Sequence, residues 1–464
     1  MKSTTQGNVI TRYISNKLEL DYHDTLKLVL SAITFFFVIG SYSILRSFKT
    51  SIFLAFVGAS YEPYSKIISI LVTIPTMLFY AKTIDKLKKH QAVYFFIGVY
   101  IVLTLLFAYL FAHPVYGIPN TVTSPSRFLG WAFEIFMDLF QALVVGTFWS
   151  FLTAISTPSF AGKSYGFIVA GSRVGGIVTT LLSWLILEKT TISATISISF
   201  LTALTAVFLM GALYCIYLIK KLVPAGHLHG YEAAYSVEQR DEKEHKETGI
   251  FEGLRLVLTE PYVLGIFGLV FSFEIINIIF DYQMHVLMSI EANNQVGAMS
   301  SFMLLYTGTF QLLGLIFATF GTSTMIRRFG VRNCLLVMPA MSVIMALMPI
   351  LYPKLLTLFI VMVVLRAINY GFNQPVREIL FIPTVKDIKF KSKAWIESFG
   401  RTLSKTTGST FNIFAAQAPY MAIVLQSTLS IVVAAAWAII AVMVGKKYIS
   451  TVESNSVIGG RKRS

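Results

Sequence analysis

The stretch VYFFIGVYIVLTLLFAYLFA, residues 93–112, decides the fold class of this chain. It has no charged side chain, and a helix of its length crosses the roughly 30 Å hydrocarbon core of a bilayer. Backbone N–H and C=O groups cannot face lipid unpaired, so such a segment forms its hydrogen bonds internally, as a helix does. The stretch therefore predicts a transmembrane helix.

Similar apolar runs recur along the whole chain, which has 464 residues, 55% of them hydrophobic and only 13% charged. A soluble domain carries about 25% charged residues. We predict twelve membrane-spanning helices, near 26–47, 64–82, 93–112, 128–153, 165–187, 193–219, 262–286, 300–321, 333–352, 355–375, 396–415 and 421–445.

A polar insertion at 220–250 divides these spans into two sets of six, and the two halves are weakly similar. IDKLKKHQA (84–92) follows span 2 as IRRFGVRNC (326–334) follows span 8, and GKSYGFIVAGSRVGG (162–176) opens span 5 as SKAWIESFGRTLSKTTG (392–408) opens span 11. The fold class predicted is an all-α membrane protein with twelve transmembrane helices in two six-helix repeats, major-facilitator-like. Its parts are a cytoplasmic N-terminal segment (1–25), an N-terminal bundle (26–219), a cytoplasmic loop (220–250), a C-terminal bundle (251–445) and a basic cytoplasmic tail (446–464).

The net charge of +15 lies mostly on one set of loops and on the two termini. By the positive-inside rule both termini are cytoplasmic, and the same rule explains most basic loops without any ligand. No compact basic domain is present, which excludes a nucleic-acid partner. Acidic residues directly before the first span exclude a cleavable signal peptide. Cys215 and Cys334 lie in or beside apolar runs and are expected to be reduced packing residues.

Several acids are predicted inside the membrane, where an ionised side chain costs about 2.5–3.5 kcal/mol and therefore faces a cavity or a partner. Glu134 and Asp138 share one face of span 4, since they are four residues apart. Glu274, Asn277 and Asp281 share one face of span 7 in the same way, although Asp281 is close enough to the span end to be interfacial.

Six cations in or directly beside the predicted spans are candidates for binding a ligand, namely Arg46, Lys49, Arg173, Arg366, Arg401 and Lys405. Two interpretations that need no ligand stay open. Arg46 and Lys49 could snorkel to a membrane interface, and Arg173 and Arg366 could be structural partners of the acids. We expect instead that the cations converge on a water-filled pocket and bind a multivalent anion.

No enzyme chemistry is indicated. SFAGKS (159–164) resembles the end of a phosphate-binding P-loop, but Thr157 stands where the motif requires Gly. His227 and His229 lack further ligands at metal spacing, so no metal site is predicted. No nucleophile has a positioned base. We predict a transporter that needs no cofactor.

The chain resembles the nucleotide transporters (ATP/ADP translocases) of plastids and obligate intracellular bacteria. Three segments carry the resemblance: YSILRSFKTSIFLAFVGASYEPYSKI (42–67), MDLFQALVVGTFWSF (137–151) and NQPVREILFIPTVKDIKFKSKAW (373–395) with the residues that follow it. The last is similar to the family's Lys-Glu-x-x-x-Ile-Pro and Lys-x-Lys-Gly-Lys-Ala signatures and is the most specific match.

The resemblance places substrate-coupled charges on Lys49, Asp138 and Arg377. Asp138 replaces a family Glu, Arg377 replaces a family Lys, and the family's span-7 acid falls on Asn277 with Glu274 one turn away. It also implies a nucleotide or another small anion as substrate, surrounding lipid, a monomer, and a bacterial inner membrane as location. Because of these differences from the family pattern at Asp138, Arg377 and Asn277, the identity of the substrate stays open.

The function predicted is exchange of a nucleotide, such as ATP for ADP, by alternating access. The alternative is proton-coupled transport of another anionic solute, with Glu134, Asp138 or Glu274 as the titrating group. A receptor or assembly factor that transports nothing is a third interpretation, which the short loops disfavour.

Overall fold

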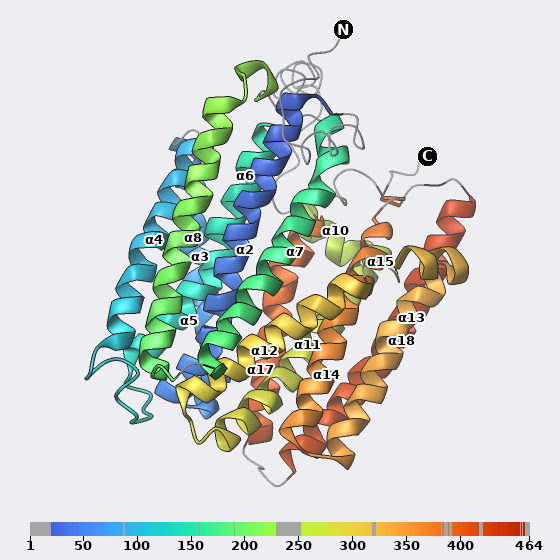
Figure 1. The fold of residues 1–464 in the computed structure, drawn as a ribbon. Helices are drawn as coiled ribbons and strands as arrows, with labels where there is room; N and C mark the ends of the chain where they lie inside the picture. Colours follow the sequence, from blue (N-terminus) through green and yellow to red (C-terminus); the bar gives the residue numbers. More distant parts are fainter. Residues whose placement is uncertain are drawn as a thin grey trace. The chain divides into compact units, whose positions relative to one another are not determined.

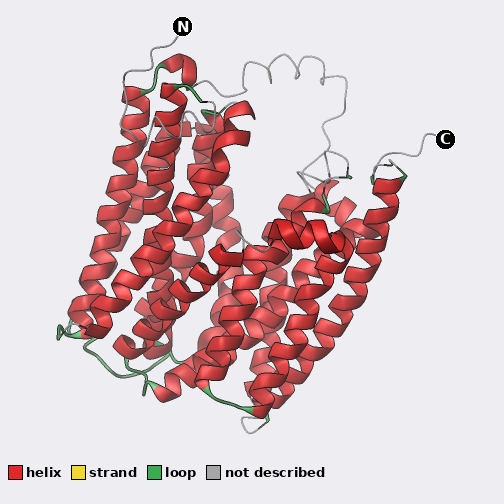
Figure 2. Ribbon diagram, turned by 45° about the vertical axis from the view of Figure 1, so that its right-hand side comes forward, coloured by secondary structure: helices red, strands yellow, loops and turns green. Residues whose placement is uncertain are grey.

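The computed structural model describes residues 20–86, 89–156, 158–189, 191–228, 252–317, 322–381, 383–384, 388, 392–416, 421–454, 456 and 458–459. Within these residues the secondary structure is helical, apart from one isolated bridge between Thr384 and Ile458 (Figure 2). The all-α prediction is confirmed.

Two compact units make up the chain. Unit 1 comprises Met1–Val57, Leu71–Lys246 and Gln295–Gly308, and unit 2 comprises Gly58–Ile70, Glu247–Asn294 and Thr309–Ser464. Two helices therefore contribute to both units, namely α3 (Glu62–Lys86) and α12 (Val296–Ile316).

The remaining helices each belong to one unit, and Figure 1 labels the α-helices among them except α16. Unit 1 holds α2 (Tyr22–Phe56), α4 (Lys89–Ala112), α5 (Phe128–Phe140), the π-helical segment η2 (Gln141–Val145), α6 (Gly146–Ala154), α7 (Pro158–Lys189), α8 (Ala194–Leu222) and the short turn η3 (Ala225–His227). Unit 2 holds η1 (Ala59–Tyr61), α10 (Glu252–Thr259), α11 (Pro261–Glu291), α13 (Thr322–Leu351), α14 (Leu355–Ile368), the π-helical segment η5 (Asn369–Asn373), α15 (Gln374–Ile379), α16 (Lys393–Trp395), the π-helical segment η7 (Ile396–Gly400), α17 (Arg401–Ala416) and α18 (Ala422–Glu453).

Ten helical stretches in the described part of the chain are long and apolar enough to cross a membrane. They match ten of the twelve predicted spans. The other two predictions, 64–82 and 396–415, fall on α3 and on η7 with α17, which are not among the ten. The number twelve thus stays a prediction.

The first membrane helix begins at Tyr22, four residues before the predicted start at 26. The cause is a cap: the carboxylate of Asp21 accepts a hydrogen bond from the backbone N–H of Asp24 at 2.7 Å. An acidic N-cap accepts a hydrogen bond from a backbone N–H that has no partner within the helix, and its negative charge is stabilised by the positive end of the helix dipole. The helix therefore extends into polar sequence that hydropathy alone does not count.

Helices α2 and α7 pack closely in unit 1 because small residues stand at their crossing. A Cβ added to Gly175 would lie 2.4 Å from the carbonyl oxygen of Phe36, closer than any real Cβ contact. On the facing side, a Cβ on Gly40 would lie 2.8 Å from the Thr179 side chain. Small residues let two membrane helices approach to backbone contact, where dispersion holds them together.

Arg127 orders the loop between α4 and α5. Its guanidinium lies 3.6 Å from the ring centroid of Phe56 and donates to four backbone carbonyls, those of Tyr116, Gly117, Asn120 and Val122. Burial lowers the pKa of this guanidinium, although an arginine remains charged in such a site. Arg127 is therefore a structural cation.

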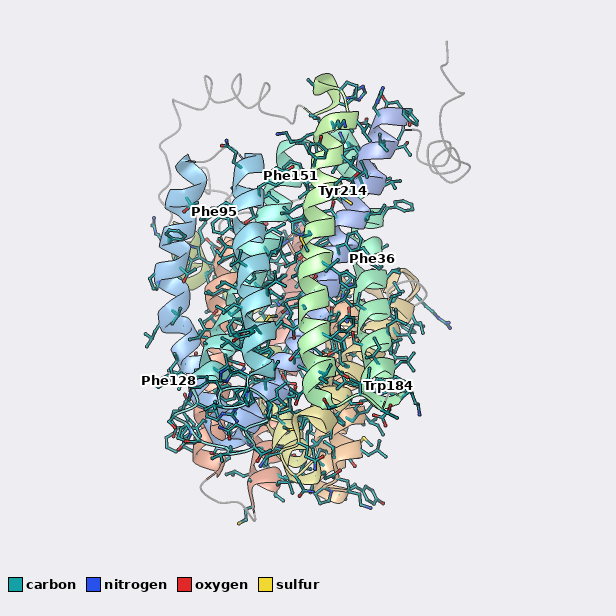
Figure 3. All side chains as sticks on the ribbon, turned by 60° about the vertical axis from the view of Figure 1, so that its left-hand side comes forward. Phe36, Phe95, Phe128, Phe151, Trp184 and Tyr214 are labelled. Atoms are coloured by element: carbon teal, nitrogen blue, oxygen red, sulfur yellow. The ribbon has the colours of Figure 1, made fainter. Side chains whose placement is uncertain are left out.

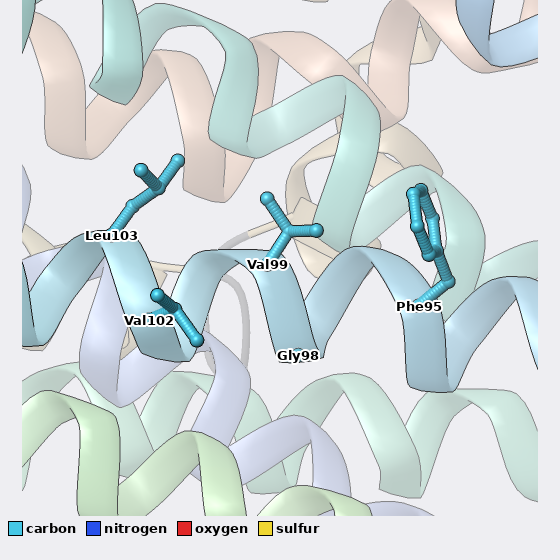
Figure 4. Close-up of a pocket in the computed structure, with 5 residues that line it drawn as sticks. All are labelled: Phe95, Gly98, Val99, Val102 and Leu103. Carbon is cyan, nitrogen blue, oxygen red and sulfur yellow. The ribbon is translucent and has the colours of Figure 1, made fainter.

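The faces of α4 and α8 that point away from the bundle are apolar and rich in aromatic rings. Phe95 on α4 and Tyr214 on α8, labelled in Figure 3, are both exposed, as is Phe128 at the start of α5. A shallow hollow on α4 is lined by Phe95, Gly98, Val99, Val102 and Leu103 (Figure 4). This apolar lining suits an acyl chain and offers no polar group to an anion.

Candidate functional site

In unit 1, Lys49 on α2 reaches two carboxylates on α5. Its Nζ lies 2.5 Å from Asp138 Oδ1 and 3.0 Å from Glu134 Oε1. Glu134 is fully buried, and Asp138 is partly exposed. Lys49 is therefore not a snorkelling lysine, because its ammonium group is paired inside the bundle. The arrangement leaves one carboxylate in excess at this cluster.

In unit 2, Arg366 on α14 forms the equivalent contact to α11. Its Nη2 donates to Asp281 Oδ2, and its Nε donates to Asn277 Oδ1 at 3.2 Å. Both partners and the arginine are buried. Arg366 therefore pairs with a span-7 acid, as one interpretation of the sequence had it. The interfacial position of Asp281 stays a prediction. Asn277 and Asp281 face α14 together because they are one helical turn apart.

A second cluster in unit 2 surrounds Arg401, the first residue of α17. Arg401 Nη2 lies 2.6 Å from Glu397 Oε2, and Nη1 lies 3.5 Å from Glu274 Oε1. The sequence analysis did not include Glu397, although its spacing of four residues from Arg401 on a helix is a detectable signal. Arg401 thus joins α17 and η7 to α11.

Arg377 lies on α15 and is 4% exposed. Its Nη1 is buried and has no hydrogen-bond partner among the described residues. The charges that act on it are the guanidinium of Arg401 and the carboxylates of Glu397, Glu274 and Glu378. Arg377 lies beyond the predicted end of span 10 at 375, but the structure places it in a helix and buries it.

The other predicted cations are less enclosed. Arg46 is half-buried on α2, and its guanidinium lies 5.9 Å from the ring centroid of Tyr42. Arg173 is half-buried on α7. Lys405 is exposed on α17, so the structure does not bring it into the ion pairs of Arg401. Lys386, Lys389 and Lys391 of the family signature lie outside the described residues.

The charges of these two clusters in unit 2 balance. The cations are Arg366, Arg377 and Arg401, and the acids facing them are Glu274, Asp281 and Glu397. An anion that binds Arg366 or Arg401 must therefore displace a carboxylate from that cation. That requirement is stricter than filling a site with free positive charge.

Asp138 and Arg366 both precede a π-helical segment. The segments η2 and η5 begin at Gln141 and Asn369, three residues after the charged side chain in each case. A π-helical turn inserts one residue and leaves weaker backbone hydrogen bonds, and such turns are frequent at functional sites. Sequence patterns gave no warning of either segment.

A further polar cluster lies where η3 meets the start of α2. His227 Nδ1 lies 3.4 Å from Asp21 Oδ2 and 3.6 Å from Asp24 Oδ1, so His227 has acidic neighbours that sequence spacing did not reveal. The Lys27 ammonium group lies 2.9 Å from Asp24 Oδ1 and also donates to the His227 carbonyl oxygen at 2.9 Å. Because Lys27 already neutralises Asp24, we interpret the group as an ion-pair cluster that fixes η3 to α2.

A family model described as TLC ATP/ADP transporter matches residues 11–448 of the chain. The chain is 24% identical to ADP,ATP carrier protein 1, chloroplastic, of Arabidopsis thaliana, over 89% of this chain and 72% of that protein. It is 23% identical to ADP,ATP carrier protein 1 of Rickettsia bellii (strain RML369-C), over 91% of this chain and 94% of that protein.

Solved transporter structures share the fold at much lower identity. A D-xylose–proton symporter superposes with a TM-score of 0.58 at 12% identity, covering 89% of this chain and 96% of that chain. The nucleoside transporter NupG gives a TM-score of 0.54 at 13% identity, covering 92% and 99%. The fold is thus major-facilitator-like, as predicted. Since one transporter family model accounts for nearly the whole length of this helical membrane protein, the chain belongs to the TLC ATP/ADP transporter family.

Proposed function

We propose that this chain exchanges nucleotides, ATP for ADP or a related pair, by alternating access through twelve helices in two six-helix repeats. The host is a bacterial inner membrane, with both termini in the cytoplasm. Family membership supports a nucleotide as cargo. The observation that carries the mechanism is the pairing of Lys49 with both Glu134 and Asp138.

These ion pairs tie helices together within each unit. Lys49 links α2 to α5, and Arg366 links α11 to α14. A phosphate offers several strong acceptor oxygens, so it competes with the carboxylates for the same cations. When phosphate takes a cation, the carboxylate is released and the two helices are no longer tied. Movement then follows substrate binding, and import becomes coupled to export.

The pairing also bears on the proton-coupled alternative. Glu134, Asp138 and Glu274 each contact a lysine or an arginine. Each cation that a phosphate would bind is thus already held by a carboxylate that the phosphate can displace. This arrangement supports exchange as the function of this site.

Thermal stability of the purified protein against a panel of ligands tests the proposal. ATP and ADP are expected to raise Tm, as any ligand that binds the folded state does, by RT ln(1 + [L]/Kd). Inorganic phosphate, glucose 6-phosphate and citrate serve as comparisons. Stabilisation by citrate or the sugar phosphate, without any by nucleotides, contradicts a nucleotide carrier. Asp138→Asn is predicted to preserve nucleotide stabilisation, because the variant removes a competitor of phosphate.

A further inference from the structure

A buried histidine faces a buried glutamate in unit 2. His285 on α11 is 4% exposed, and Glu62, the first residue of α3, is 7% exposed. His285 Nδ1 lies 2.9 Å from both carboxylate oxygens of Glu62. Neither residue was singled out from the sequence. Both ionisable side chains are thus withdrawn from solvent, where a charge is costly unless it is paired.

The geometry assigns the proton positions. A nitrogen 2.9 Å from two carboxylate oxygens must donate to them, so the proton of the neutral imidazole is on Nδ1. The other ring nitrogen, Nε2, is buried and has no hydrogen-bond partner in the described part of the chain. Any additional proton is thus bound at Nε2. Binding it changes the charge of the pair from −1 to zero.

This pair differs from the other buried acids in the kind of partner. Asp138, Glu274 and Asp281 face lysine or arginine, which stay charged at all physiological pH values. Glu62 faces histidine, whose charge changes between pH 5 and 8. The ion pairs with lysine and arginine therefore do not change with pH in that range, whereas a contact between a glutamate and a histidine can.

Other charged and titratable groups near the pair are few in the described residues. On α3, Lys66 Nζ lies 3.9 Å from Glu62 Oε1, and Tyr64 is on the same turn. On α11, Tyr282 interacts electrostatically with Glu62. Asp281, also on α11, forms an ion pair with Arg366 of α14. From η7 and α17, Glu397 and Arg401 face Glu274, about three turns away along α11. Lys66 is a second cation beside Glu62, at a longer distance than His285.

We propose that Glu62 and His285 form a proton-binding site, with His285 Nε2 as the acceptor, which holds the first turn of α3 on α11 more strongly when protonated. The segment Gly58–Ile70 belongs to unit 2, whereas the chain on both sides of it belongs to unit 1. The site therefore lies where the chain passes from one unit to the other. A protonated pair slows any movement that separates this turn from α11. Only this last consequence rests on the proposed exchange function.

Tm measurements on purified protein without substrate, from pH 5.5 to pH 8.5, test the site directly. The variants are His285→Gln and Glu62→Gln, with His113→Gln in the α4–α5 loop as the matched histidine control. A protonated imidazole paired with a carboxylate stabilises the folded state, and this contribution is lost as pH rises. His285→Gln is expected to lower Tm by about 2 °C at pH 5.5 and by less at pH 8.5. Glu62→Gln leaves the ring without a carboxylate and is expected to lose the same pH-dependent stabilisation.

A Tm difference between wild type and His285→Gln that is constant across this range overturns the proposal, as does an identical pH effect in His113→Gln. If either single variant fails to fold, the double variant Glu62→Gln/His285→Gln decides, since its two amides can bond each other. Measured against the Tm of wild type at pH 8.5, the Tm of the double variant must not change with pH. Nucleotide exchange is measured in parallel. A pH-dependent Tm with no exchange supports the proton site and removes the proposed function, whereas exchange without a pH-dependent Tm does the reverse.

Discussion

Asp138 and Arg366 occupy equivalent places in their helices with opposite charge. Each lies three residues before a π-helical segment, and each pairs with an opposite charge on another helix of its own unit, Lys49 on α2 or Asp281 on α11. Both units thus contain an ion pair whose one partner lies three residues before a π-helical segment, and this partner is an acid in unit 1 and a base in unit 2. The repetition indicates that the ion pair and the π-helical segment work together, since the weakened backbone lets the helix adjust when the pair breaks.

Replacing Lys49 tests the first of these pairs. Lys49→Met leaves Glu134 and Asp138 facing each other, and removing one partner of a buried pair costs about 3 kcal/mol. Lys354→Met, which changes an exposed lysine before α14, is the control. Chemical denaturation measures the loss. The triple variant Lys49→Met/Glu134→Gln/Asp138→Asn is expected to regain stability but not exchange; recovery of exchange would assign Lys49 a structural role only.

The planar fork of Arg366 is predicted to matter as much as its charge. Arg366→Lys keeps a cation near Asp281 but cannot also reach Asn277 in the same geometry. We expect a loss of about 1–3 kcal/mol in stability. In a double-mutant cycle with Asn277→Ala, the two losses should not add, because both remove the same hydrogen bond. Additive losses would show that Arg366 and Asn277 act independently.

Replacing Arg377 with an apolar residue is expected to preserve stability and to abolish exchange. A buried guanidinium nitrogen without a partner costs free energy, so an apolar side chain of similar length is tolerated there. Arg377→Met is expected to leave Tm unchanged or higher while abolishing exchange. Lys393→Met, which breaks the half-exposed pair with Glu378, should change neither by much. A large fall in the Tm of Arg377→Met would make Arg377 a structural residue.

Sequence patterns predicted the helices, the family and several ion-pair partners, because these depend on composition and on helical spacing. Glu134 and Asp138 four residues apart had to share a face, and a buried lysine had to find them. Contacts between distant segments were different. Glu62 and His285 are joined only by the fold, and nothing in the sequence distinguished Lys27, which is fully buried. The π-helical segments leave no composition signal at all.

The crossing of α2 and α7 gives a matched pair of glycine substitutions on one helix. Gly175→Ala places a methyl group against the Phe36 backbone, which cannot retreat, whereas a Cβ at Gly166 meets nothing within 4 Å. Overpacking of this kind costs about 1–3 kcal/mol. We expect a lower Tm for Gly175→Ala and an unchanged or slightly raised Tm for Gly166→Ala. Equal effects of the two variants would contradict the close crossing.

Counter-exchange in reconstituted vesicles tests nucleotide exchange most directly. Purified protein is placed in vesicles that contain either ADP or buffer alone, and uptake of labelled ATP is followed without a pH gradient. We predict rapid uptake into ADP-loaded vesicles, little into empty ones, and little in either case with Lys49→Met. Equal uptake into loaded and empty vesicles, or uptake driven by an imposed pH gradient alone, would contradict exchange.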